Sequence, residues 1–107
     1  MSKTTFFEVP NVVSTGMELE RRVDLALHEA QNKSRSGRDY SQELVECLSA
    51  LKDFCDYNER AMDEMEKKAL SKGDELFIVE MINPMRSDLQ RKEESVREEI
   101  KRLQMGR

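Results

Sequence analysis

The stretch that decides the fold runs from Leu44 to Ala69 and reads LVECLSALKDFCDYNERAMDEMEKKA. Its apolar residues recur at alternating spacings of four and three, over almost four heptads. We call these positions the heptad stripe: Leu44, Leu48, Leu51, Cys55, Asn58, Met62, Met65 and Ala69. Three further residues widen the stripe on one flank: Cys47, Phe54 and Ala61. A stripe of this width favours a helical bundle rather than a two-stranded coiled coil alone. The pattern therefore predicts one long, amphipathic helix.

The segment before this helix carries a helical pattern of its own. Thr15 and Glu18 have the spacing of a capping box, in which each side chain satisfies a free backbone amide of the first turn. Apolar residues then recur at helical spacing from Leu19 to Ala30, and a basic loop with Gly37 follows. These features predict a helix over about 17–33.

The segment after the heptad stripe predicts a third helix. Gly73 suits the left-handed position that ends a helix, and Asp74 can cap the next one, which we expect to run to about residue 105. Pro84 falls inside this helix. Because the apolar stripe keeps its phase across Pro84, we expect a kink there, although Asn83 could alternatively cap a new helix.

Together these elements predict an all-α fold. Two long helices, at about 40–71 and 74–105, are joined by a short turn and should fold back as an antiparallel hairpin. The helix at about 17–33 is half as long and covers part of this hairpin. Residues 15–107 would then form a single helical bundle domain.

Residues 1–14 differ from the rest of the chain. They contain two adjacent phenylalanines, three valines and Pro10, with little charge. Proline and β-branched residues disfavour a helix, so we expect an extended N-terminal arm that docks on its own bundle, on a sister subunit or on a partner.

The helix lengths predict exposed apolar surface, because one short helix cannot cover both long ones. Leaving large apolar side chains in water forgoes about 1.5–3 kcal/mol each, so we expect self-association or a partner protein. The residues that we expect to bind a partner, in the arm and on the uncovered faces of the hairpin, are Phe6, Phe7, Val9, Val12, Val13, Leu48, Leu51, Cys55, Met62, Met65, Ile82, Met85 and Leu89.

Asn58 is a polar residue within the heptad stripe. A buried amide among Leu and Met side chains can set the register and the oligomer order of packed helices. It would do so opposite its symmetry mate in a homodimer or opposite a polar group on the third helix. The alternative is a boundary position that water reaches.

Composition argues against most chemistry. The 107 residues include 22 acidic and 18 basic ones, which gives a net charge of −4 and disfavours binding to nucleic acid. His28 is the sole histidine, and no motif for a metal, a cofactor, a phosphate loop or a catalytic nucleophile is present. We therefore expect no enzymatic activity, no cofactor and no metal. No apolar run is long enough to span a membrane.

The two cysteines, Cys47 and Cys55, are eight residues apart on one helix, or about 12 Å along its axis. They cannot form a disulfide with each other within that helix. We expect both to be reduced in the cytoplasm, with a bridge between two subunits of a homodimer as the alternative.

These observations favour a non-enzymatic binding protein that shields or inhibits another protein through helical contacts. In general form the chain is similar to small helical-hairpin proteins such as type III secretion chaperones, transcription anti-activators and phage-encoded inhibitors, a likeness that assigns no functional residue. A structural subunit of a homo-oligomeric helical assembly is the main alternative. A weaker one is an acidic mimic of nucleic acid, formed by Asp53, Asp56, Glu59, Asp63, Glu64 and Glu66.

Overall fold

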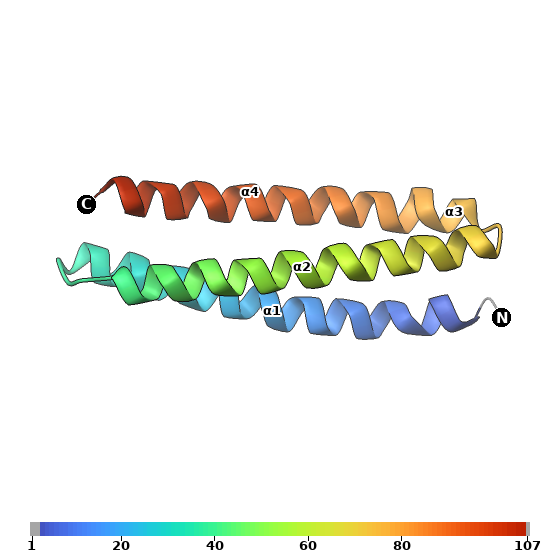
Figure 1. The fold of residues 1–107 in the computed structure, drawn as a ribbon, viewed down its shortest axis with the longest axis horizontal. Helices are drawn as coiled ribbons and strands as arrows, with labels where there is room; N and C mark the ends of the chain where they lie inside the picture. Colours follow the sequence, from blue (N-terminus) through green and yellow to red (C-terminus); the bar gives the residue numbers. More distant parts are fainter. Residues whose placement is uncertain (1–2, 107) are drawn as a thin grey trace.

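In the computed structural model, three long helical rods lie side by side along one axis (Figure 1). The structure describes the backbone of residues 3–106 and the side chains of residues 14–106. The elements, in chain order, are α1 (Lys3–Arg35), α2 (Ser41–Ser71), α3 (Glu75–Phe77), the π-helix η1 (Ile78–Ile82) and α4 (Asn83–Met105). No strand occurs among these described residues, so the predicted all-α fold class is confirmed.

The chain reverses direction at two loops, each of which contains a glycine with positive φ. Gly37 has φ +71° in the loop between α1 and α2, and Gly73 has φ +70° in the turn between α2 and α3. In the second turn, Asp74 caps α3 as predicted, because its carboxylate accepts a hydrogen bond of 3.2 Å from the backbone N–H of Phe77. The turns place α2 antiparallel to both neighbouring rods (Figure 1).

The N-terminal segment corrects two predictions. α1 begins at Lys3 and has 33 residues, so the described backbone within residues 1–14 is helical, and the prediction of an extended arm is wrong. Thr15 and Glu18 lie inside α1 and do not cap its start. A proline removes one intrahelical hydrogen bond and bends a helix, and contact with a neighbouring helix along most of its length can offset that loss. α1 is consequently as long as α2, and the expected short first helix is wrong as well.

A π-helical turn replaces the predicted kink near Pro84. The backbone stays helical from α3 through η1 into α4, and the N–H of Asn83 donates to the carbonyl of Ile78, five residues earlier. Pro84 follows at the start of α4. A proline ring crowds the carbonyl four residues before it, and the wider π turn gives that carbonyl room. The irregularity that Pro84 predicts in this helix is therefore a π turn, which contains one residue more than a regular α-helical turn.

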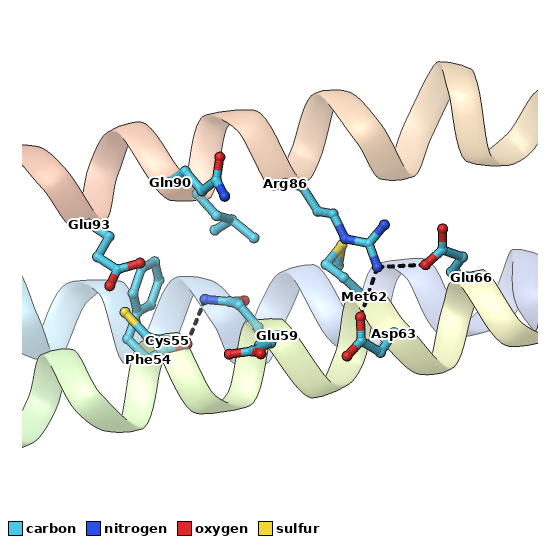
Figure 2. Close-up of a pocket in the computed structure, with 11 residues that line it drawn as sticks. Phe54, Cys55, Glu59, Met62, Asp63, Glu66, Arg86, Gln90 and Glu93 are labelled. Carbon is cyan, nitrogen blue, oxygen red and sulfur yellow. Dashed lines mark hydrogen bonds and ion pairs between the residues drawn. The ribbon is translucent and has the colours of Figure 1, made fainter.

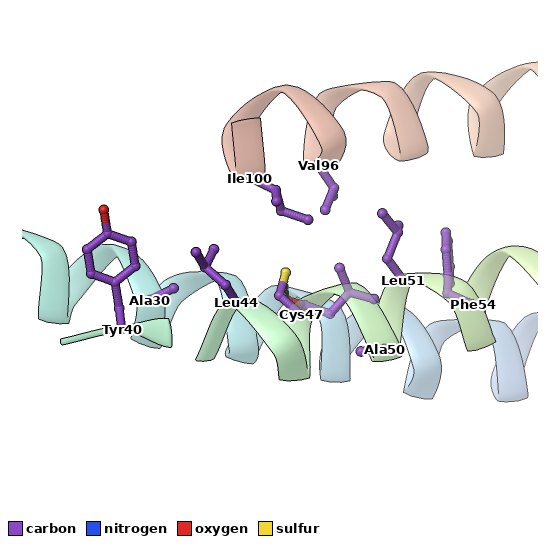
Figure 3. Close-up of a cluster of buried hydrophobic side chains, with 10 residues drawn as sticks. Ala30, Tyr40, Leu44, Cys47, Ala50, Leu51, Phe54, Val96 and Ile100 are labelled. Atoms are coloured by element: carbon purple, nitrogen blue, oxygen red, sulfur yellow. Dashed lines mark hydrogen bonds between the residues drawn. The ribbon is translucent and has the colours of Figure 1, made fainter. Parts of the chain in front are cut away.

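The molecule is a thin rod. It measures 55 × 19 × 15 Å, and its radius of gyration is 16.8 Å, compared with about 13 Å for a compact domain of this length. Such a cross-section holds three helices around a narrow core, and the buried side chains form two clusters. Beside the α1–α2 loop, the larger cluster consists of Val23, Ala30, Tyr40, Leu44, Cys47, Ala50, Leu51, Phe54, Val96 and Ile100. In Figure 3, Val96 and Ile100 point from α4 toward the side chains of α2.

The smaller cluster lies toward the turn between α2 and α3. It consists of Met62, Met65 and Ile82, against which Phe77, Ile78, Met85 and other partly buried side chains pack. Here α2 contacts η1 and the start of α4. Between the two clusters lies the section of the bundle that contains Asn58.

Ion pairs connect the three rods outside the core. Lys92 of α4 lies 2.8 Å from Asp24 and 3.3 Å from Glu20, both in α1. Partial burial alone would lower the pKa of Lys92, but the bonds to the two carboxylates outweigh it and the pKa is raised. Arg22 of α1 pairs with Asp53 of α2 at 2.9 Å. In the part of the chain that the structure describes, no helix has a stretch long and apolar enough to cross a membrane.

Candidate protein-interaction surface

Large apolar side chains are exposed at the end of the rod where α2 turns into α3. Leu76 is 64% exposed and Val79 is 61% exposed, and they lie three residues apart on neighbouring positions of one helical face. Leu70 at the end of α2 and Met81 in η1 are also exposed. We call these four residues the turn surface. Exposed apolar residues that gather in one region mark interaction sites more often than scattered ones do.

The local sequence explains why the turn surface faces water. The Asp74 cap and the positive φ of Gly73 fix the tight turn that brings α3 back against α2. Phe77 and Ile78 then pack onto the smaller core cluster, which leaves Leu76 and Val79 outside. Leu76 and Val79 therefore stay mostly uncovered by residues 14–106.

A groove of about 460 Å³ runs between α2 and α4 (Figure 2). Its floor contains Phe54, Cys55, Met62 and Leu89, which are buried or partly buried. Its rim is polar and mostly acidic. Four carboxylates and one guanidinium line it: Glu59, Asp63, Glu66, Glu93 and Arg86.

Arg86 crosses from α4 to α2 at the end of the groove nearest the turn surface. Its guanidinium lies 2.9 Å from Asp63 and 2.9 Å from Glu66, shown as dashed lines in Figure 2. The hydrogen bond from Arg86 lowers the pKa of Glu66, and the same pair raises the pKa of Arg86. Glu59 has no ion-pair partner among residues 14–106. The groove therefore keeps an unneutralised negative charge near its middle.

Cys55 has a thiol that resists ionisation. Burial and the neighbouring Glu93 carboxylate raise the pKa of Cys55 to about 11. Burial also raises the pKa of Cys47, which belongs to the larger core cluster. Both cysteines are free thiols in this chain. At neutral pH they are protonated, and neither is an activated nucleophile.

The expected partner-binding residues fall into three groups. Leu51, Met62, Met65 and Ile82 are buried in the chain's own core, so the prediction that they form an uncovered surface is wrong. Leu51 belongs to the larger cluster with Val23 of α1, and the other three pack against one another and against partly buried residues of α3 and η1. The second group is at least partly accessible: Leu48 is exposed, and three further expected residues are half-buried, namely Cys55, Met85 and Leu89.

The third group is the N-terminal one. The backbone of these residues belongs to α1, but their side chains lie outside the part of the chain that the structure describes: Phe6, Phe7, Val9, Val12 and Val13. Their assignment to partner binding stays a prediction.

Asn58 is buried within the chain's own bundle, with 6% of its surface exposed. Its amide nitrogen donates a 2.8 Å hydrogen bond to the backbone carbonyl of Phe54. Its amide oxygen faces Gly16 of α1, where a Cβ atom would lie only 3.2 Å from it. Within the chain, Asn58 thus contacts α1 rather than the third helix, and its burial argues against the alternative of a boundary position that water reaches; its role opposite a symmetry mate stays a prediction.

A second, smaller hollow of about 160 Å³ lies on the α1 side of the same section. It shares four lining residues with the larger groove: Phe54, Asn58, Met62 and Leu89. These side chains therefore separate two hollows in the middle section of the bundle.

Sequence reasoning missed the turn surface. Leu76 and Val79 were not among the expected binding residues, because their positions are off the main apolar stripe of the third helix. A signal was available, since residues 76–79 are four consecutive large apolar residues, more than one helical face can bury. Among the described residues, no group of three or more His, Cys, Asp or Glu side chains is arranged to hold a metal ion.

Comparisons of the chain with protein-family models, with curated proteins and with solved structures found no match.

Proposed function

We propose that this chain is a non-enzymatic, helical protein-binding module that shields or inhibits a partner protein. The observation that carries the proposal is the turn surface, where Leu76 and Val79 are nearly two-thirds exposed and lie three residues apart at one end of the rod. A side chain of this size gains about 1.5–3 kcal/mol when a partner buries it fully. Leu76 and Val79, which share one helical face, supply the apolar centre of a small interface.

The proposed binding function uses no catalytic side chain. Both thiols are protonated at neutral pH, and two of the four groove carboxylates, Asp63 and Glu66, pair with the Arg86 guanidinium. These features support binding over chemistry. They also weaken the nucleic-acid mimic, because Lys52 and Arg86 pair with carboxylates of the acidic face.

The test compares two double variants with equal loss of exposed apolar surface. Leu76→Ser with Val79→Ser removes the centre of the turn surface. Leu25→Ser with Val45→Ser is the matched control, because these residues are 58% and 64% exposed and lie elsewhere on α1 and α2. Both variants should keep the far-ultraviolet circular dichroism spectrum of the parent.

Capture experiments with the tagged chain, analysed by mass spectrometry, then decide the question. We expect a protein that the parent and the control retain and that the turn variant loses, and added parent chain should block that protein's activity or its aggregation. Equal retention by all three chains overturns the proposal. If light scattering instead shows that the parent self-associates and the turn variant does not, the homo-oligomeric structural subunit replaces it.

Calorimetry on the purified parent separates the two versions of the proposal. A client-binding chaperone should melt broadly alone and gain stability with its client. An inhibitor should melt sharply without any ligand, and a broad, weak transition rejects that version.

A further inference from the structure

We propose that the groove between α2 and α4 binds a single basic, amphipathic helix from a partner protein. The inference rests on the proposed function in one respect, that the ligand is part of a protein. It concerns a different surface from the turn surface, and the two can fail separately.

The groove has the dimensions of a helix-binding site. On α2 it extends from Phe54 to Glu66, which is about 18 Å along the axis and a little over three helical turns. Its volume of about 460 Å³ accommodates two or three apolar side chains rather than a whole helix. A partner helix would therefore lie across the mouth of the groove and insert one apolar face, as in helix-in-groove recognition.

The floor supplies an apolar contact. Cys55 and Leu89 are half-buried and form its accessible part, and Phe54 and Met62 (both labelled in Figure 2) are buried beneath them. Met and Leu side chains adapt their rotamers to an incoming group. The smaller hollow behind the same residues gives them space to move when an apolar side chain enters.

The rim selects a basic ligand. Along α2, the carboxylates of Glu59, Asp63 and Glu66 are spaced by four and three residues, which places them in one row. Arg86 neutralises part of the charge at Asp63 and Glu66, so the carboxylate of this row that is open to a Lys or Arg of a partner helix is Glu59. Glu59 has no ion-pair partner within residues 14–106, so a ligand cation gains a contact there without displacing Arg86.

The charge pattern disfavours a second copy of the chain as occupant. A second copy would bring its own net charge of −4 toward an acidic rim, which repels it. A basic helix is instead attracted before contact, and its binding should weaken with salt.

The probe is a synthetic helical peptide of about 18 residues with Leu and Lys at helical spacing, labelled for fluorescence anisotropy. A peptide with Glu in place of Lys and a scrambled peptide of the same composition are controls. The matched variants are Glu59→Lys, at the rim, and Glu64→Lys, an exposed residue of α2 outside the groove. Both variants change the net charge equally, so they separate contact at the groove from general attraction.

Alkylation of Cys55 reports occupancy directly. In a Cys47→Ala background, Cys55 is the single thiol, and it lies in the floor of the groove. Bound peptide should slow its reaction with maleimide. Denatured chain, tested alongside, should react equally with and without peptide.

We expect the Lys peptide to bind, to protect Cys55 and to bind more weakly as salt rises from about 50 to about 300 mM. Glu59→Lys should weaken binding about tenfold, whereas Glu64→Lys should change it less than about twofold. Equal effects of the two variants, equal binding of the Glu or scrambled peptide, or full reactivity of Cys55 in the complex each overturn the groove proposal.

The variant Leu76→Ser with Val79→Ser keeps the two proposals apart. If it loses its captured partner but still binds the peptide, both proposals stand. If no chain binds the peptide and this variant still loses its partner, the groove proposal alone fails. If peptide binding meets every expectation and the variant retains its partner, the proposal for the turn surface fails alone.

Discussion

Replacing Asn58 by Leu should stabilise the protein. The Asn58 side chain is 6% exposed, and its amide donates to the carbonyl of Phe54, one helical turn earlier. That carbonyl also accepts the regular helical hydrogen bond from the backbone N–H of Asn58, so it keeps a partner when the side chain is removed. The change therefore leaves no unsatisfied carbonyl in α2.

The magnitude follows from two opposing terms. Loss of the side-chain hydrogen bond costs about 0.5–1.5 kcal/mol, and full burial of a leucine contributes about 1.5–3 kcal/mol. The hollows on either side of Asn58 leave space for the larger side chain to turn away from Gly16. The expected net gain in the free energy of unfolding is about 1–2 kcal/mol, which raises Tm by at least about 4 °C.

The assay is urea unfolding followed by circular dichroism, with thermal melting at two protein concentrations. Asn58→Ala is the control, because it removes the amide without adding apolar volume, and it should be about 1–2 kcal/mol less stable than the Leu variant. A Leu variant less stable than the parent in both assays would refute this account of the buried amide. A change of oligomeric state on light scattering would show instead that Asn58 sets the register, as its place in the heptad stripe suggested.

Three further predictions concern single contacts. Gly16→Ala should stabilise the protein by less than the usual ~1 kcal/mol, because the added Cβ presses on the Asn58 oxygen. In an Asn58→Ala background the same change should contribute the full amount. A double-mutant cycle that shows no coupling between the two positions would contradict this contact. Glu93→Gln should lower the pKa of Cys55 from about 11, measured as the midpoint of alkylation rate against pH, and an unchanged midpoint would remove Glu93 as a cause. Lys33 of α1 lies 2.5 Å from Glu43 at the start of α2, and its hydrogen bond lowers the pKa of Glu43 below 4.5. The contribution of this pair to stability is therefore present above pH 4.5 and is lost as the pH falls through the lower pKa of the folded state. Glu43→Gln should therefore flatten the decline of urea-unfolding stability below pH 4.5, and an identical decline in both proteins would argue against the pair.

The predictable parts of the fold were those with strong periodicity or specific turn chemistry. The heptad stripe gave α2 its bounds within a residue or two, and Gly73 and Asp74 marked the turn because each residue type suits its backbone position. Both signals depend on the local sequence, so tertiary contacts do not change what they predict.

The errors came from weighing local propensity without tertiary contacts. Pro10 and its β-branched neighbours disfavour a helix in isolation, yet α1 continues through them alongside α2. This one error propagated, because a short α1 implied an uncovered hairpin and hence a binding surface made of core residues. Met62 and Ile82, expected at that surface, are among the most buried side chains of the molecule.

The candidate sites were harder to predict than the helices. The groove depends on how far apart α2 and α4 stand, and no periodicity specifies that distance. The turn surface depends on the π turn, which shifts the helical phase between Ile78 and Ile82 and decides which neighbours face outward. Pro84 signalled an irregularity there but not its form.

The division of the core into two clusters has a mechanical consequence. Each cluster holds its own end of a 55 Å rod, and between them stands a section with a hollow on both sides. We expect the rod to bend at this middle section and its two ends to open on different timescales, which hydrogen exchange would resolve. A helix bound across this middle section would contact both halves of the rod and join them into one cooperative unit. Binding of the partner would then also make the rod stiffer.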